Sequence, residues 1–336
     1  MRVTGGSDLA RMQALQKQAL ATRDRLDTAA TEMTTNLKSS RFDATGGNLT
    51  RLFALERSLD RNAVFSDNIT LTELRLDTMQ ATFGQIQTAL EDLSIDMVSA
   101  TSLGDYSAAM RHATTARSDF AATVGQLNGQ VAGQSLFAGT TTDRPALAAA
   151  DALLADLDAL AAGSADAAAA IAAIDDYFAK PAGAFYTSGY VGSTDDLTAV
   201  AIGEGQRVDY GIRADQEELV AVLRAQAMAA VVAGGAFAGD QAGQMAMLSE
   251  AGDRLLAAKE GILDLRSAVG SQQEQVETAK AQRVSEHDTL DLARSKLMAT
   301  DPVEAASAYQ ALEVQLEAIY TVTARLAGLR FVNYMR

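Results

Sequence analysis

The placement of proline is the feature that most constrains this chain. Its three prolines are Pro145, Pro181 and Pro302, so residues 1–144 and 182–301 contain none. Because proline lacks a backbone N–H donor and clashes with the preceding turn, the interior of a helix tolerates it poorly. Both proline-free stretches are therefore able to form long helices.

Apolar residues recur at heptad spacing at both ends of the chain. Near the N-terminus one row is spaced by seven residues and a weaker row follows three residues after it; the rows are Met12, Ala19, Leu26 and Met33, and Leu15, Thr22, Ala29 and Asn36. Near the C-terminus the steps alternate between four and three, through Ala305, Tyr309, Leu312, Leu316, Ile319, Thr323 and Leu326. Such spacing predicts helices with one apolar stripe.

A helix with a single apolar stripe cannot bury that stripe alone. The simplest partner for the N-terminal stripe is the C-terminal one, which would bring both chain ends to one pole and the middle of the chain to the other. The candidate contact residues are Met12, Leu15, Leu26 and Met33 on one helix and Tyr309, Leu312, Leu316, Ile319 and Leu326 on the other. An ordinary intramolecular bundle and a surface for other chains would both produce this periodicity.

Helical spacing also fills the stretches between the two end helices. We expect one long helix from about 49 to 100 and another helix over about 106–133. A third should run from about 241 to 300, with a weak point near Gly261 or Gly270.

The start of the last helix is well marked in the sequence. In Thr300-Asp301-Pro302-Val303-Glu304, Asp301 fits the N-cap and Pro302 fits the first helical position. Glu304 stands where the acidic residue of a capping box belongs. We therefore expect the C-terminal helix to begin at Pro302.

The centre of the chain differs in composition. Residues 146–180 are rich in alanine and predict two short helices joined at Gly163-Ser164, with Ser164 as the N-cap of the second. Residues 182–213 contain short runs of aromatic and β-branched residues separated by glycines. These runs predict a small antiparallel hairpin or a three-stranded sheet.

Together these patterns predict a mainly α fold. It is a long antiparallel helical bundle or coiled coil built from both termini, with a small α/β insert at the centre of the chain. The terminal heptad helices, expected to form an assembly core, cover residues 1–40 and 301–336. The rest of the bundle covers 41–144 and 237–300, and the variable insert covers 145–236.

Composition excludes several classes of function. The chain has no cysteine, which rules out disulfides and thiol chemistry, and its only histidines are His112 and His287. Its net charge of −15 opposes binding to nucleic acid or to an anionic membrane. His287 lies between Glu286 and Asp288 and would need a second histidine or converging carboxylates to hold a metal. We expect no enzymatic activity, catalytic residue, cofactor, metal or membrane insertion.

Four segments resemble the bacterial flagellin superfamily. The C-terminal stretch Leu316–Met335 is similar to the family's tail, and Leu26–Gly47 occupies the place of a characteristic N-terminal segment. This segment departs from the family, because Leu37-Lys38-Ser39-Ser40 lacks the family's glycine and Asp43-Ala44 replaces its Asp-Asp pair. Leu265–Glu277 resembles an internal family motif without its Asn-Arg ending. Gly133–Leu147, with the sequence GQSLFAGTTTDRPAL, resembles a segment of the hook-associated proteins of the hook–filament junction.

This resemblance implies a self-assembling structural subunit that joins hook to filament. Such proteins pass unfolded through the flagellar type III export channel, which agrees with an N-terminus that has no apolar signal-peptide core. The implied partners are copies of the chain in a ring, the second junction protein, flagellin and a cytoplasmic export chaperone. The implied location is the extracellular flagellum, after a cytoplasmic stage. A flagellin that forms the filament itself, or another type III exported helical protein, is the alternative.

Overall fold

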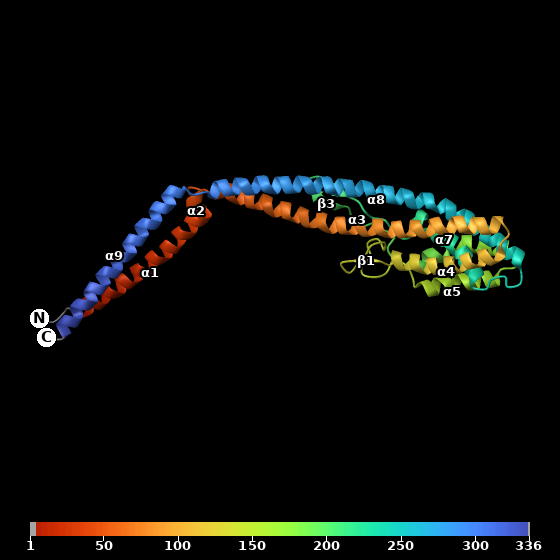
Figure 1. Ribbon diagram of the computed structural model, residues 1–336, viewed down its shortest axis with the longest axis horizontal. Coiled ribbons are helices and arrows are strands. Elements are labelled where there is room, and N and C mark those ends of the chain that lie inside the picture. Colours follow the sequence, from red (N-terminus) through yellow and green to blue (C-terminus); the bar gives the residue numbers. More distant parts are fainter. Residues whose placement is uncertain (1–4, 335–336) are drawn as a thin grey trace. The chain divides into compact units, whose positions relative to one another are not determined.

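The computed structural model describes residues 5–334, and the chain is mainly helical (Figure 1). Its internal contacts divide it into two compact units. We call residues up to 63 and from 284 onward the terminal unit, and residues 64–283 the central unit. Two long helices, α3 (Thr50–Ser102) and α8 (Gln241–Met298), contribute residues to both. The expected mainly α fold with a small central α/β part is confirmed.

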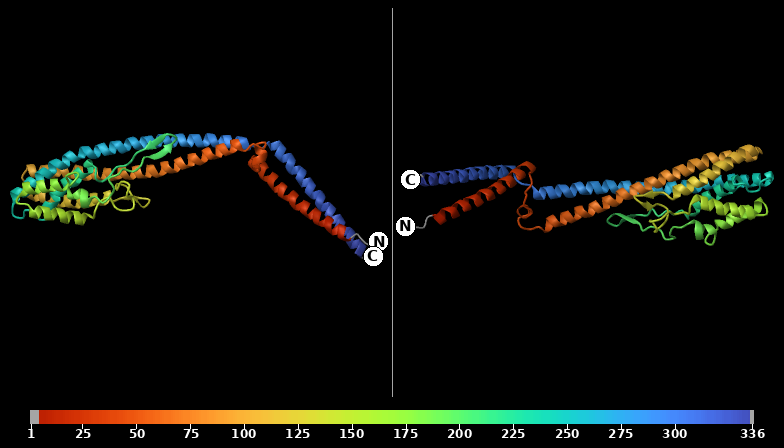
Figure 2. Two further views of the ribbon diagram at one scale, coloured as in Figure 1. Left: turned by 180° about the vertical axis from the view of Figure 1, so that it is seen from behind. Right: turned by 90° about the horizontal axis from the view of Figure 1, so that it is seen from below.

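The terminal unit is built around two helices from opposite ends of the chain. These are α1 (Gly5–Thr35) and α9 (Pro302–Tyr334), which pack against each other. The start of α1 and the end of α9 lie at the same end of this pair (Figure 1), and Figure 2 shows the pair from two further sides. A short helix, α2 (Arg41–Ala44), precedes α3. The two heptad stripes of the sequence therefore meet in an antiparallel pair.

A short antiparallel bridge joins the end of α1 to the start of α9. The backbone N–H of Lys38 donates to the carbonyl of Met298 at 2.7 Å, and the N–H of Thr300 donates to the carbonyl of Asn36 at 3.0 Å. The Asp301 carboxylate then accepts a hydrogen bond from the Val303 N–H at 2.8 Å. Asp301 thus satisfies a free donor at the start of α9, as its expected role of N-cap requires.

The central unit contains shorter helices packed beside α3 and α8. These helices are α4 (Tyr106–Leu127), α5 (Ala150–Gly163), α6 (Ala167–Tyr177) and α7 (Glu217–Ala233). Two small antiparallel hairpins complete the unit, formed by β1 (Gln130–Val131) with β2 (Gln134–Ser135) and by β3 (Val200–Gly203) with β4 (Gln206–Val208).

The core of the central unit surrounds α7. Most of its residues are apolar, and nearly every side chain from Leu219 to Val232 is buried. A helix of this kind is stable only inside a layer of other elements. It packs on α4, where the Gln226 amide donates to the Thr123 hydroxyl at 3.2 Å, and on α5 and α6.

Polar contacts hold α3 against α8 within the central unit. Lys280 pairs with Glu73 at 2.8 Å, and the Gln273 amide donates to Asp77 at 2.7 Å. These contacts follow one another in opposite directions along the two helices, which are therefore antiparallel. Helix α8 is one continuous helix, as expected, and it runs through both Gly261 and Gly270, where a weak point was expected. A Cβ at Gly261 would lie 3.1 Å from the Glu218 side chain, so this glycine allows close packing of α7 on α8.

The centre of the chain differs from the sequence-based expectation in three places. Helix α4 ends at Leu127, before Gly133, because the Asn128 side chain accepts from the Leu147 N–H at 2.7 Å and the chain turns into the first hairpin. The N-cap of α6 is Asp166, which accepts from the Ala169 N–H at 2.8 Å. The Ser164 hydroxyl instead donates back to Leu160 at 2.9 Å.

The third difference lies in the segment that was expected to be β. Phe185–Gly189 forms one π-helical turn, and the only strands described within residues 182–213 are β3 and β4. Phe185 is fully buried, with its ring 5.1 Å from that of Phe178. Aromatic residues favour strands only where neighbouring strands provide the packing, and here the packing is provided by a helix end.

The segment Gly133–Leu147 forms part of the core. Leu136, Phe137 and Ala138 are buried, and Gly139 has a φ of +61°. A Cβ on Gly139 would lie 2.5 Å from the Ser193 carbonyl oxygen, so only glycine fits without movement of the backbone.

We expect Gly139→Ala to destabilise the central unit more than Gly133→Ala. Both glycines have positive φ, which costs alanine about 1–2 kcal/mol. At Gly133 no atom lies within 4 Å of the added Cβ, whereas at Gly139 two carbonyl oxygens must also move. Thermal unfolding followed by circular dichroism measures both losses, and equal losses would show that the contact at Gly139 does not matter.

Candidate subunit interface

The seam between α1 and α9 buries few side chains. Of the residues whose side chains the structure describes on these two helices, those that are buried are Thr22, Ala29, Ala305 and Ile319. Three of these four side chains are small, so two helices by themselves exclude water from only a narrow strip. A narrow strip contributes little stability, because the hydrophobic effect is roughly proportional to the apolar area that is buried.

Most of the contact residues expected from the sequence lie along this seam without being fully covered. The half-buried ones are Met12, Leu15, Leu26, Tyr309, Leu312, Leu316 and Leu326. Ile319 is buried, with 6% of its surface exposed. Met33 is 40% exposed, because it lies in the last turn of α1, where α9 has only just begun at Pro302.

Thr22 and Ala29 belong to the weaker of the two N-terminal rows and were not among the expected contact residues. Their small side chains let the helix axes approach, and the distance between packed helices depends on the side chains at the contact. The seven-residue spacing of this row was the available signal, although its residues are less apolar than those of the other row.

Further apolar side chains of this helix pair point away from the seam. Leu20 is 63% exposed, Val314 is 65% exposed and Tyr320 is 53% exposed. A single apolar residue on a surface needs no explanation, but here three lie on a two-helix element with a half-covered seam. The pair therefore has apolar surface available for contact with additional helices.

Charge is divided unequally between the two units. The terminal unit contains 15 of the 28 basic and 14 of the 43 acidic residues, which gives a net charge of +1. The central unit contains the other 13 basic and 29 acidic residues and has a net charge of −16. Like charges oppose contact between two central units, whereas two terminal units can meet without net repulsion.

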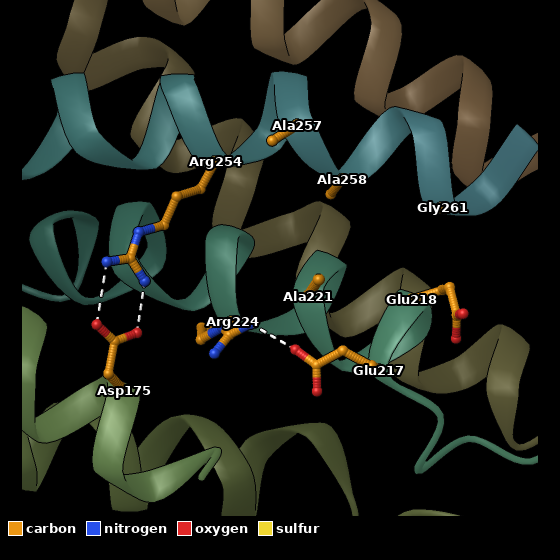
Figure 3. Close-up of a pocket in the computed structure, with 9 residues that line it drawn as sticks. All are labelled: Asp175, Glu217, Glu218, Ala221, Arg224, Arg254, Ala257, Ala258 and Gly261. Atoms are coloured by element: carbon orange, nitrogen blue, oxygen red, sulfur yellow. Dashed lines mark hydrogen bonds and ion pairs between the residues drawn. The ribbon is translucent and has the colours of Figure 1, made fainter.

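An open groove of about 550 Å³ lies in the central unit between α6, α7 and α8 (Figure 3). Arg254 on α8 makes two hydrogen bonds to Asp175 on α6, and Arg224 donates to Glu217 on α7 at 2.8 Å. The bond to Asp175 raises the pKa of Arg254. The Arg254–Asp175 pair joins α8 to α6, whereas the Arg224–Glu217 pair lies within α7. Because each of these charges is neutralised by its partner, the two pairs are structural rather than reactive.

The histidine and acidic side chains do not form a metal site in the part of the chain that the structure describes. His287 is exposed, with its Nδ1 3.6 Å from Asp288. Across the described residues, no three His, Cys, Asp or Glu side chains come together in a way that could hold a metal ion. Likewise, none of the described helices has the length and hydropathy needed to cross a bilayer.

Comparison with known proteins identifies neighbours of this fold. No protein-family model and no curated protein matches the sequence. The crystal structure of Bacillus cereus FlgL is similar, with 15% identity and a TM-score of 0.50 over 72% of this chain and 100% of that one. A putative flagellar hook-associated protein from Vibrio parahaemolyticus also has 15% identity and a TM-score of 0.50, over 73% of this chain and 95% of its own. A sequence identity of 15% limits this likeness to the fold. The shared fold confirms the resemblance found in the sequence.

Proposed function

We propose that this chain is a non-enzymatic structural subunit of the bacterial flagellum that joins hook to filament. The observation that carries the proposal is the half-covered seam between α1 and α9, in a fold shared with hook-associated proteins. The segment Gly133–Leu147 supports the junction role, because it resembles such proteins in sequence.

The physical mechanism is packing of the terminal units of several copies. A seam that two helices cover only in part gains buried apolar area when helices of neighbouring copies close over it. Assembly then stabilises the terminal unit by mass action, so its order and its association are linked. A contact between two different surfaces can repeat from copy to copy and close into a ring. The same kind of contact can join this ring to hook subunits on one side and to filament subunits on the other.

The proposed partners follow from this position. They are copies of the chain in a ring, the second junction protein on the hook side or flagellin on the filament side, and an export chaperone in the cytoplasm. Export of an unfolded chain through a narrow channel is compatible with a sequence that has no cysteine to cross-link it. The final location would be the extracellular flagellum.

Deletion of the gene in its own bacterium tests this function. We expect electron microscopy to show complete hooks without filaments, and a blot of the medium to show monomeric flagellin. Loss of filaments in a strain with no other flagellin would instead make this chain the filament subunit. Normal filaments would overturn both assignments.

A further inference from the structure

A second groove lies in the terminal unit, between the start of α3 and the end of α8. Its volume is about 370 Å³, and it is lined by Arg51, Thr289, Leu292, Ala293, Lys296 and Leu297. The floor of the groove is mainly apolar, and its Leu292 side chain is 56% exposed to solvent. The groove therefore offers apolar surface that none of the described residues covers.

The two charged residues of this groove are both basic and both exposed. Within the part of the chain that the structure describes, neither Arg51 nor Lys296 has an acidic group within 4.0 Å, although the nearby Arg294 is paired with Asp291 at 2.5 Å. Two cations beside the exposed Leu292 would be complemented by an apolar residue with acids next to it.

The same terminal unit presents such a surface on α9. Val314 is 65% exposed, and both Glu313 and Glu317 are exposed without a described ion pair. At 3.6 residues per turn, Val314 points away from the seam residues Leu312 and Leu316. Glu317 follows Val314 by three residues and therefore lies on the same outer face of the helix.

This face of α9 cannot enter the groove of its own chain. Lys296 precedes the start of α9 by six residues, and Glu317 stands a further fifteen residues along the helix. A rise of 1.5 Å per residue places Glu317 about 22 Å from that start. An acidic and apolar helix face that fills the groove must therefore come from another molecule.

We propose that the groove at Arg51 and Lys296 receives the outer face of α9 from a second copy of the chain. Val314 would lie against Leu292, and Glu313 and Glu317 beside the two cations. The contact joins two different surfaces, so it can repeat from one copy to the next. It deepens the proposed function by assigning one of the surfaces through which copies assemble.

Charge reversal tests this contact in cells from which the gene has been deleted. We expect Lys296→Glu, and separately Glu317→Lys, to reduce filaments per cell at least tenfold relative to the wild-type gene. The variant with both changes should restore at least half of the wild-type number, because the pair of opposite charges is re-formed. Arg57→Glu, the same change at an exposed arginine on another side of α3, should behave as wild type.

The outcomes separate this proposal from the one on which it rests. If the wild-type gene is not needed for filaments, the proposed function fails. If it is needed but both single reversals support normal filaments, only the groove contact is wrong. If the single reversals are defective and the combined variant is equally defective, α9 is not the occupant of the groove.

Engineered cysteines provide a direct measurement, because the chain has none of its own. Cells that express a mixture of Lys296→Cys and Glu317→Cys should, after mild oxidation of isolated flagella, yield a disulfide-linked pair of chains of about twice 35.3 kDa. A mixture of Arg57→Cys and Glu317→Cys should yield none. Cross-linking of the second mixture as strong as that of the first would overturn the assignment.

Discussion

Ile319→Asp should abolish assembly while leaving the central unit folded. Among the seam residues whose side chains the structure describes, Ile319 is the one large side chain that is buried, with 6% of its surface exposed. A carboxylate at this site would be a charge within a buried apolar seam, and burial of a charge costs several kcal/mol. Since about 1.4 kcal/mol is a factor of ten in an equilibrium constant, we expect at least a 100-fold loss of association. Filaments per cell and sedimentation of the purified chain measure the effect.

Two further variants show whether burial in the seam is the cause. Leu316→Asp changes a half-buried residue of the same seam, and it should also stop assembly while still allowing export into the medium. Gln315→Asp places the same charge on α9 at an exposed polar side chain, and it should leave assembly intact. Normal filaments with Ile319→Asp would show that the seam is not the assembly surface.

Asp215→Ala should destabilise the central unit by about 3–5 kcal/mol, the usual cost of removing one member of a buried ion pair. Asp215 is 1% exposed and accepts from the Arg213 Nε at 2.7 Å, an interaction that raises the pKa of Arg213. Without the carboxylate, a guanidinium that is only 14% exposed loses its buried partner. The midpoint of urea unfolding, followed by circular dichroism, measures the loss.

Asp196 provides the matched control for this pair. Its carboxylate contacts the same Arg213 but is 59% exposed, and exposed ion pairs contribute about 0–1 kcal/mol. Asp196→Ala should therefore change the unfolding midpoint little. If the two variants lost the same stability, burial of Asp215 would not be the source of the effect.

The long helices are predictable because the information for them is local. Their proline-free length and helical spacing predicted segments at about 49–100 and 241–300, and the structure has α3 at Thr50–Ser102 and α8 at Gln241–Met298. The start of α9 was predictable for the same reason, since Asp301 caps a helix whose first residue is a proline.

The centre of the chain was less predictable because its local signals depend on distant partners. The aromatic residues around Phe185 suggested a strand, but Phe178 and the surrounding core hold them in a π-helical turn. Ser164 and Asp166 are both possible N-caps for α6. The structure uses Asp166, which directly precedes the first residue of the helix. Propensity cannot resolve alternatives that differ mainly in tertiary packing.

The candidate interface was likewise predictable only in part from the sequence. Heptad spacing identified the two helices and placed Ile319 on the seam. The candidate contact residues were then chosen for their apolar character, so Met33 was included and Thr22 was not. In the structure Met33 is 40% exposed and Thr22 is 3% exposed. Which row lies deepest depends on how closely the two helices approach, and that distance is a property of the pair.

The sequence by itself determined the helical class of the chain, its two terminal stripes and its acidic character, because periodicity and composition require no knowledge of distant contacts. Only the tertiary structure decided which side chains cover one another. It showed that the stripes leave their own seam half open, and that Arg51 and Lys296 lie in one groove although α3 and α8 are far apart in the chain. The physical reason is that burial and charge pairing depend on distances in space, which spacing along the chain does not contain.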